Sequence, residues 1–512
     1  MSDSPGPAIG RDGGLVKLGS LIIPYEAIGD ARLMNAISED PGDYAFHIDA
    51  HGPLPRVSFR ALLEVLDRAD LRGCGGARYP VADKLRALRA GRTPLVVVNG
   101  AEGEPGSAKD HLLLAIKPHL VFDGAVAVAR AIGAKEIVVA VTDPHLVEIL
   151  DIARRRRPHS HLIRIRQLEA RYITGEGGAL ISALNGGNGL PPGRRRHATE
   201  RGFRGAPTLL CNVETWAQVA LAILTDSNQT CRTNEWTGAN RHSGVTTRLL
   251  TVTGAAAKPG VYEIPTKIRL REIMRIAGVN KPQAVVIGGY HGSWLSPDPE
   301  LSLSAAALSE VKATLGPGVI AFLGQDTCPL GELAAVAQWL AYESAKQCQP
   351  CKLGLPALAD NLTALSTGTS ADPTEVDIIQ QLGSRINGNG ACSHPDGATR
   401  FIRNGLEFLS GDIATHRKFG GCDRDTKGYL ALTKADALTP PTPPASQEIL
   451  MSVDLTRCKG NGHCAALLSG AVSFDGQLHF PKIDQTRLAT VPRRALLRAV
   501  SACPALALRL GP

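Results

Sequence analysis

The chain has 512 residues, of which 44% are hydrophobic and only 4% aromatic, and its formal net charge is +8. This length is enough for roughly three or four domains. A nucleic-acid-binding protein usually combines basic patches with aromatic side chains, so this composition argues against that class. No run of about 18 apolar residues occurs, and the opening sequence MSDSPGPAIG has no secretory character. We therefore predict a cytoplasmic protein with no membrane span and no nucleic-acid partner.

A glycine cluster follows the first predicted helix. Residues 1–58 form a mixed segment to which the sequence assigns no function, and residues 59–69 have the pattern of a helix. The sequence GCGGARYP comes next. Its residues Gly73, Gly75 and Gly76 lack Cβ, so the backbone can take positive φ and approach a flat or phosphorylated ligand closely.

Strands and helices then alternate. Residues 95–98 are apolar and mostly β-branched, as expected of a buried parallel strand, and Asn99, Glu102 and Glu104 come directly after it. A helix over 120–132, ending at Gly133, leads to a strand over 136–141, and another strand is expected over 162–165. This alternation predicts a doubly wound α/β sheet, in which ligands bind beyond the carboxyl ends of the strands.

Eleven cysteines are concentrated late in the chain. Cys348 and Cys351 form a CxxC pair, Cys458 and Cys464 form a CxxxxxC pair, and Cys503 precedes a proline. In a reducing cytoplasm such spacing favours metal or cluster ligation over disulfides. Cys74 and Cys328 fit neither pattern, so we interpret both as small core residues.

The glycine loop joined to the sequence NGAEGEPG resembles the F subunit of bacterial NADH-quinone oxidoreductase (complex I), which carries flavin and oxidises NADH. That family, with homologues in NAD-linked hydrogenases and formate dehydrogenases, joins a GRGGAGFP-like loop to NADEGEPG. Two later stretches, RYITGEGGALISALNGG and GAPTLLCNVETWAQVA, resemble the family's AYICGEETALIESLEG and GRPTTVNNVETLANV. The resemblance implies a Rossmann-like domain over 59–245 that binds FMN and NAD(P)H and leaves hydride transfer to the flavin. The implied cofactor-binding residues are Gly73, Gly75, Gly76, Tyr79, Lys84, Asn99, Glu102, Glu104, Tyr172, Gly175, Glu176, Arg194, Asn212, Glu214 and Thr215.

Several positions depart from that family. Ala101, Gly177 and Cys211 replace an aspartate, a glutamate and an asparagine, while Ala87 and His197 replace aromatic residues. Fewer stacking faces weaken the nicotinamide side, whereas the three arginines of 194–196 strengthen phosphate binding. We therefore hypothesise that the protein accepts or prefers NADPH.

Residues 246–326 resemble the SLBB-like β-grasp module that follows the flavin domain in this family, and we interpret it as scaffolding. Residues 327–432 resemble the helical iron–sulfur domain, with Cys348, Cys351 and Cys392 on ligand positions. Ala345 stands where the first cysteine ligand should be, so a four-cysteine cluster cannot form from these positions. A three-iron cluster, a substitute ligand such as Cys422 or His394, and an empty remnant all stay open.

Residues 433–448 include TPPTPPA and are predicted to be a proline-rich linker. Residues 449–512 resemble a βαβ-type ferredoxin of the actinobacterial single-cluster kind, with Cys458, Cys464 and Cys503 as ligands. Asn461 occupies the middle cysteine position. Three thiolates suit a 3Fe-4S cluster, whereas a 4Fe-4S cluster would need Asn461, His463 or solvent as its fourth ligand.

Together these resemblances imply an FMN-dependent NAD(P)H oxidoreductase that passes electrons to iron–sulfur clusters, including one in its own ferredoxin domain. An external acceptor protein, such as a cytochrome P450 or another ferredoxin, would take the electrons; a quinone and a hydrogenase-like partner are also compatible. Two alternatives stay open: a subunit of a larger NAD-linked complex, and a degenerate scaffold that carries a ferredoxin.

Overall fold

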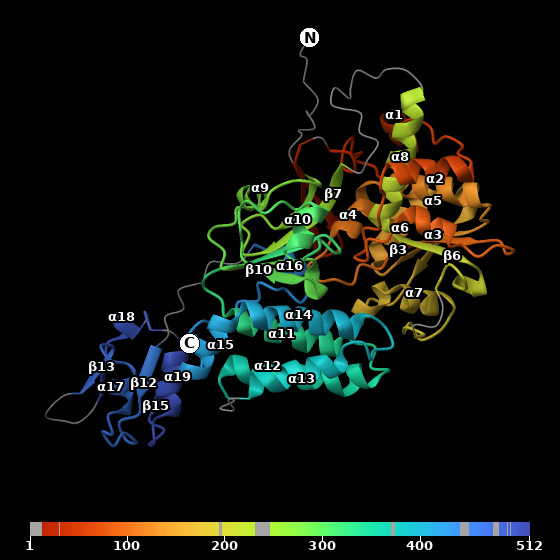
Figure 1. Cartoon of the computed structure of the whole chain (residues 1–512). Helices are drawn as coiled ribbons and strands as arrows, with labels where there is room; N and C mark the ends of the chain where they lie inside the picture. Colours follow the sequence, from red (N-terminus) through yellow and green to blue (C-terminus); the bar gives the residue numbers. More distant parts are fainter. Residues whose placement is uncertain are drawn as a thin grey trace, which may run out of the picture.

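The computed structural model describes residues 13–29, 31–193, 197–230, 246–369, 374–440, 450–474, 481–488, 490–491 and 493–511. It contains an α/β domain, a mixed β-sheet, a layer of helices and a small C-terminal domain, arranged as shown in Figure 1. The chain is thus a multidomain α/β and α+β protein.

The α/β domain is built on a parallel sheet of four strands in the order β5-β4-β3-β6. The strands are β3 (Leu95–Gly100), β4 (Ile137–Val141), β5 (Ile163–Gln167) and β6 (Thr208–Asn212). Apolar β-branched residues dominate β3 and β4 because both strands are covered on both faces. The register pairs Asn99 with Asn212, so both amides reach the carboxyl edge of the sheet together.

Two long helices, α5 (Pro118–Ile132) and α8 (Val213–Thr230), cross the sheet side by side (Figure 1). They approach so closely that a Cβ added at Gly124 would lie 1.9 Å from the carbonyl oxygen of Trp216. The α5 helix ends at Gly133, which has a φ of 71°, as the sequence predicts. The remaining helices of this domain are α2 (Phe59–Arg68), α3 (Val81–Arg86), α4 (Lys109–Ile116), α6 (Pro144–Arg155) and α7 (Gly177–Leu184).

The second sheet has seven strands and includes the N-terminal residues. A hairpin of β1 (Gly14–Leu18) and β2 (Leu21–Ala27) adds to its edge, so this part of the N-terminal segment, to which the sequence assigned no function, belongs to the sheet. Buried Glu263 fixes this arrangement by accepting backbone N–H bonds from Arg32, Leu33 and Met34. The other strands are β7 (Thr247–Gly254), β8 (Gly260–Pro265), β9 (Ala284–Ile287), β10 (Ser293–Leu295) and β11 (Val319–Leu323), and α1 (Tyr44–His51), α9 (Leu270–Ile276) and α10 (Ala305–Glu310) lie outside the sheet.

A helical layer follows, comprising α11 (Pro329–Tyr342), α12 (Leu355–Thr367), α13 (Glu375–Ile386), α14 (His394–Phe408) and α15 (Ser410–Phe419). The chain then returns toward the α/β domain. Buried Glu332 on α11 holds this return segment by accepting the backbone N–H groups of residues 427–430. The short helix α16 (Lys434–Ala437) continues the core, so the expected linker over 433–448 does not begin until after α16.

The C-terminal domain has its own small core around Met451, Leu468, Leu488 and Leu496. The strands β12 (Leu450–Val453) and β15 (Leu508–Gly511) pair antiparallel, as do β13 (Val472–Phe474) and β14 (Pro481–Ile483). Three helices complete the domain: α17 (His463–Leu467), α18 (Gln485–Leu488) and α19 (Arg493–Ser501). The domain lies beside α15, where Arg498 donates a hydrogen bond to the carbonyl of Phe419 (Figure 1).

Within the described ranges, no single helix has both the length and the apolar character required to cross a bilayer. The consecutive helices α4 and α5 reach that length together, but they are bent by 92° and are almost wholly buried inside the α/β domain.

Candidate functional site

The carboxyl edge of the parallel sheet brings together residues from three separate stretches. Asn99, at the end of β3, donates from Nδ2 to the carbonyl of Gly175 at 3.0 Å and accepts from the Ala101 N–H at 3.1 Å. Gly175 is essential to this approach, since a Cβ there would lie 2.9 Å from the carbonyl oxygen of Ala101. The strand end and the 172–175 turn are therefore locked against each other.

The glycine loop closes over the end of β6. The Gly73 N–H donates to the carbonyl of Tyr79 at 3.0 Å, and the Cys74 N–H donates to Thr215 Oγ1 at 2.9 Å. A Cβ built on Gly75 would lie 3.2 Å from the Cβ of Asn212, whereas one on Gly76, at a φ of 116°, would meet nothing within 4 Å. The loop thus presents bare backbone next to Asn212, which is a surface suited to a flat ligand.

Tyr79 is free to contact a ligand, whereas Lys84 is already engaged in a hydrogen bond within the protein. The Tyr79 ring is 49% exposed at the rim of the loop, where it can stack on a ligand. Lys84 Nζ instead donates to the carbonyl of Leu210 at 2.9 Å and holds α3 against β6. Arg194 lies outside the described residues.

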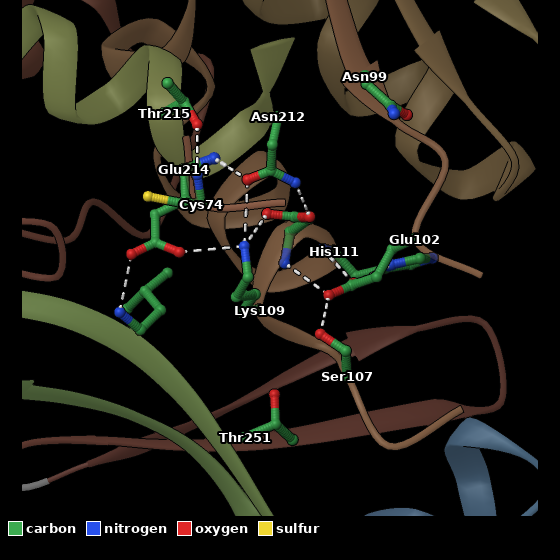
Figure 2. A network of polar contacts seen from close by, with 12 residues as sticks. Cys74, Asn99, Glu102, Ser107, Lys109, His111, Asn212, Glu214, Thr215 and Thr251 are labelled. Atoms are coloured by element: carbon green, nitrogen blue, oxygen red, sulfur yellow. Dashed lines mark hydrogen bonds and ion pairs between the residues drawn. The ribbon is translucent and has the colours of Figure 1, made fainter. Parts of the chain in front are cut away.

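A buried ion network lies directly beneath this loop (Figure 2). Lys109 Nζ lies 2.8 Å from Asp110 Oδ1, 3.0 Å from Glu214 Oε2 and 3.1 Å from Asn212 Oδ1. Burial alone would lower the pKa of Lys109, but Asp110 and Glu214 reverse this effect and raise it. Burial raises the pKa of Asp110 to about 6, although Lys109 opposes the change. The network orients the Asn212 amide from below.

Two arginines beside the glycine loop fit an anionic group. Arg248 is buried, and its Nη1 has no hydrogen-bond partner. Burial, followed by the nearby charge of Arg248, lowers the pKa of Arg78. Two guanidinium groups and a glycine-rich backbone are donors that suit an anionic group such as a phosphate.

The loop over residues 101–108, called the acidic loop here because it carries Glu102 and Glu104, is held by hydrogen bonds to Glu102. Glu102 accepts from the Asp110 and His111 N–H groups at 3.1 Å each, from His111 Nδ1 at 2.6 Å and from Ser107 Oγ (Figure 2). Burial alone would raise the pKa of Glu102, but Lys434 and His111 outweigh it and lower the pKa. Glu102, Glu214 and Thr215 thus position the loops, and their direct contact with a cofactor stays a prediction.

Glu104 points toward the helical layer. It accepts from the Tyr290 N–H at 3.3 Å and is hydrogen-bonded to the Tyr172 phenol. Lys434, from α16, donates to the carbonyl of Glu104 at 2.8 Å. The Tyr172 ring makes edge contacts with Trp339 and His394. Glu176 caps α7 by accepting from the Ala179 N–H at 2.7 Å.

The stability of the ligand-free protein should depend on pH through Glu104. Burial raises the pKa of Glu104 from its ordinary value of 4.5 to about 7. Between these values the folded state binds more protons than the unfolded state, so stability falls as pH rises through this window. We expect Glu104→Gln to reduce the loss of unfolding free energy between about pH 4.5 and pH 8 by roughly 3 kcal/mol.

Urea denaturation at several pH values measures this effect. Glu64→Gln provides the control, because Glu64 is 52% exposed and pairs only with Arg60 four residues away. Identical pH profiles for wild type and Glu104→Gln would contradict the prediction.

Three cysteines gather beyond the C-terminal end of α11. Cys348 and Cys351 are in thiol contact, and the charge of Cys392 acts on Cys351. Cys392 packs with Ala345, Ile173 and Ala179, which places this thiol group against the turn that carries Tyr172. The three donors suit an iron–sulfur cluster that has one corner without a cysteine.

The structure corrects one of the substitute ligands considered for this cluster. Cys422 lies with Cys328 and His416 at the N-terminal end of α11. That helix has 14 residues and is about 20 Å long, so Cys422 is too distant to replace the missing ligand. His394 is nearer in sequence to Cys392; its Nε2 donates to the Leu340 carbonyl, and its buried Nδ1 has no hydrogen-bond partner.

The three C-terminal cysteines surround a hollow. Cys458, Cys464 and Cys503 line a shallow pocket together with Asn461, His463 and Pro504. The two candidates for an additional ligand, Asn461 and His463, are thus at the same hollow as the thiols.

Two parts of the chain match models of known protein families. Residues 66–221 match the family model described as the Nuo51 FMN-binding domain. Residues 332–416 match the NADH-ubiquinone oxidoreductase-F iron-sulfur binding region. Both descriptions concern NADH oxidoreductase F proteins, and the chain is similar to such proteins over these two parts.

Individual relatives agree with these matches. The chain is 26% identical to the second NADH-quinone oxidoreductase F protein of Rhizobium meliloti (strain 1021), across 78% of this chain and 94% of that protein. It is also 26% identical to the F protein of the same enzyme from Aquifex aeolicus (strain VF5), across 71% of this chain and 87% of that protein. A solved structure of an NAD+-reducing NiFe-hydrogenase in the air-oxidized state superimposes with a TM-score of 0.62 at 26% identity. That match covers 76% of this chain and 68% of the hydrogenase chain.

The sequence did not single out four charged residues that lie in or beside the glycine loop: Arg78, Lys109, Asp110 and Arg248. Lys109 and Asp110 come three and four residues after the end of the NGAEGEPG stretch, and two consecutive charges at the start of a mostly apolar helix were a usable signal. Arg248 carried no such signal, because only the tertiary structure brings β7 beneath the glycine loop.

Proposed function

We propose that this protein is an FMN-dependent NAD(P)H oxidoreductase that passes electrons to iron–sulfur clusters, including one in its own C-terminal domain. The observation that carries the proposal is the junction at the sheet edge within the matched FMN-binding domain. There, bare glycine backbone and two paired asparagines lie together, and the buried Arg248, from β7, is close to the glycine loop and has an unpartnered guanidinium nitrogen. The guanidinium group can donate to a phosphate, and the asparagine amides can pair with the donors and acceptors at the edge of a ring. The glycine backbone provides a surface for a flat ring.

Different residues would bind different parts of FMN. Arg78 and Arg248 would hold the phosphate, Asn99 and Asn212 would orient the ring system, and Tyr79 would cover the rim. Bound FMN would supply the hydride acceptance and the release of single electrons. The role of the protein is positioning, since hydride transfer needs reacting atoms about 3–3.5 Å apart.

We propose finer assignments for the individual folds. The parallel β5-β4-β3-β6 sheet supports a Rossmann-like flavin domain. The mixed sheet and α9 support an SLBB-like β-grasp scaffold, which the N-terminal hairpin extends. The C-terminal order of strands and helices around three cysteines supports a ferredoxin, although its strands pair antiparallel. That ferredoxin would hold a 3Fe-4S or 4Fe-4S cluster.

The position of Cys392 favours electron flow from the flavin domain into the helical layer. Cys392 packs against Ile173, and the neighbouring Tyr172 is hydrogen-bonded to Glu104. The proposed cluster of Cys348, Cys351 and Cys392 therefore adjoins the proposed FMN pocket. An external acceptor protein in the cytoplasm, such as a cytochrome P450 or another ferredoxin, would complete the path.

An anaerobic titration of the purified chain with NADH and then NADPH tests the proposal. Optical absorbance follows the flavin, and electron paramagnetic resonance on the same samples follows the clusters. Flavin bleaching together with cluster reduction is the expected result. Clusters without reducible flavin would instead favour the scaffold alternative, which Ala101, Gly177, Ala87 and Ala345 motivate.

Dinucleotide preference follows from the same titration. We propose that Arg194, Arg195 and Arg196, which lie outside the described residues, favour NADPH through its additional phosphate. A triple substitution to alanine should then lower the rate with NADPH more than the rate with NADH. Equal effects on both dinucleotides would exclude this preference.

A second candidate function is membership of a larger NAD-linked complex. It is favoured by relatives whose names describe them as subunits and by the likeness to the NAD+-reducing NiFe-hydrogenase. Co-purification of the chain with a thioredoxin-like ferredoxin carrying two irons would support this assembly. A monodisperse single chain with full activity would exclude it.

Restoring the missing ligand should complete the cluster of the helical layer. Ala345 is 9% exposed and packs beside Cys392, so Ala345→Cys places a fourth thiol at the donor set. We expect reconstituted Ala345→Cys protein to bind about four irons at this site, as a 4Fe-4S cluster. Iron analysis and electron paramagnetic resonance are best made with Cys458, Cys464 and Cys503 replaced by serine, which removes the C-terminal signal. An unchanged iron content would contradict the expectation.

A further inference from the structure

A second set of metal-binding side chains lies away from both predicted cluster sites. Cys328 Sγ, a ring nitrogen of His416 and Cys422 Sγ all lie within 4.8 Å of one another. Within the part of the chain that the structure describes, no other set of three or more histidine, cysteine or acidic side chains is close enough to share one ion. Cys328 and His416 are buried, and Cys422 is half-buried.

The three donors come from positions that the fold holds firmly. Cys328 is the N-cap of α11, and its Sγ accepts from the Gly331 N–H at 3.3 Å. His416 lies in the last turn of α15, and its Nε2 is 3.4 Å from Cys328 Sγ. Cys422 follows that helix and is hydrogen-bonded to the side chains of Cys328 and Arg424. Arg424 in turn donates to Asp412 and Gln283.

These separations match a mononuclear site. With Zn–S near 2.3 Å and Zn–N near 2.0–2.1 Å, neighbouring ligand atoms of a tetrahedral zinc ion lie about 3.4–3.8 Å apart. The measured distance of 3.4 Å between Cys328 Sγ and His416 Nε2 falls in this range. Two thiolates neutralise the charge of a divalent cation. Neutrality matters here because two of the ligands are buried, and an uncompensated buried charge is costly.

We propose that Cys328, His416 and Cys422 bind one zinc ion, with water at the fourth position. Two thiolates and an imidazole are ligands that zinc prefers, and three protein ligands leave one coordination position open. The site differs from the proposed iron–sulfur sites because its donors are close enough for a single ion. It does not depend on the proposed electron-transfer function.

The ion would fasten the return segment of the chain to α11. Three residues after Cys422, the Asp425 carbonyl accepts the Cys328 N–H at 2.9 Å, and the backbone N–H groups of residues 427–430 donate to Glu332. The same segment ends in Lys434, which donates to the acidic loop at the carbonyl of Glu104. A zinc ion at its start would thus stabilise the path from the helical layer back to the FMN region.

Metal analysis of the full-length protein tests this site. After incubation with equimolar zinc and gel filtration, we expect one zinc per chain by mass spectrometry. Zinc K-edge X-ray absorption should show two sulfur ligands and one imidazole, and iron in the clusters does not contribute to that edge. Cys422→Ser should lower the zinc content at least tenfold, whereas Cys422→His should retain it because a ligand is preserved.

Cys351→Ser is the matched control, since it removes a thiol of the other site and should leave zinc unchanged. His416→Gln guards against a folding artefact: its flavin content and circular dichroism should equal wild type while zinc is lost. Less than a tenth of a zinc per chain in wild type would overturn the proposal. A Cys328–Cys422 disulfide in the anaerobically purified protein, or iron at this site after removal of the clusters, would also overturn it.

Discussion

Replacing Lys109 with methionine should destabilise the flavin domain by about 3–5 kcal/mol and release FMN. The side chain is fully buried and is the cation shared by Asp110 and Glu214. Methionine fills a similar volume but leaves both carboxylates without a counter-ion. It also removes the donor that orients Asn212, so the amide beside the glycine loop would lose its position.

Chemical denaturation and the flavin-to-protein absorbance ratio measure the two effects. Arg60→Met is the matched control, because its partner Glu64 is half-exposed and Arg60 itself is 91% exposed. A surface pair of this kind contributes about 0.3–0.5 kcal/mol. The double variant Lys109→Met/Glu214→Gln should recover part of the loss, since it removes one unpaired carboxylate. A cost below about 1 kcal/mol for Lys109→Met would show that the network does not support the flavin domain.

The second large effect is expected at the C-terminal cysteines. Cys464→Ser or Cys503→Ser should abolish the cluster at this pocket, because either change leaves only two of its thiolates. Reduction of a one-electron acceptor protein should then fall by about 10²-fold or more, the advantage that tethering of two modules commonly provides. Reduction of a small dye by NADH should stay near wild type, because the FMN site is untouched.

Asn461→Cys provides a change in the opposite direction. It adds a thiol at the same hollow and creates the ordinary CxxCxxC spacing, so a 4Fe-4S cluster is expected. Electron paramagnetic resonance distinguishes this cluster from a three-iron form. Acceptor reduction that survives Cys464→Ser would mean that electrons leave the protein from the helical layer instead.

Three substitutions relative to the F-subunit sequences are compatible with the local structure of the matched FMN-binding domain. Cys211 is buried within β6 and packs in the core, while the neighbouring Asn212 keeps the amide at the sheet edge. Ala101 donates its backbone N–H to Asn99, an interaction that requires no side chain. Gly177 begins α7, for which Glu176 supplies the cap. At these three positions, backbone groups or neighbouring side chains provide the local structure.

The local features of the fold follow from residues that are neighbours in the chain. Apolar runs set β3 and β4, Gly133 ended α5, and the three motif stretches marked the sheet edge, because strand burial, helix termination and backbone freedom depend on residues close in the chain. Cysteine spacing likewise indicated two thiol groups. None of these features required knowledge of distant contacts.

Packing between distant elements determines which of these residues can face a ligand. Thr215, predicted to contact flavin, anchors the glycine loop at Cys74. Cys328, interpreted as a core residue, is buried as expected but also meets His416 and Cys422 across 88 residues of sequence. Lys109 becomes the centre of the network because β6 and α8 bring Asn212 and Glu214 to it. Buried polar groups must find partners, and those partners are fixed by packing between elements that lie far apart in the chain.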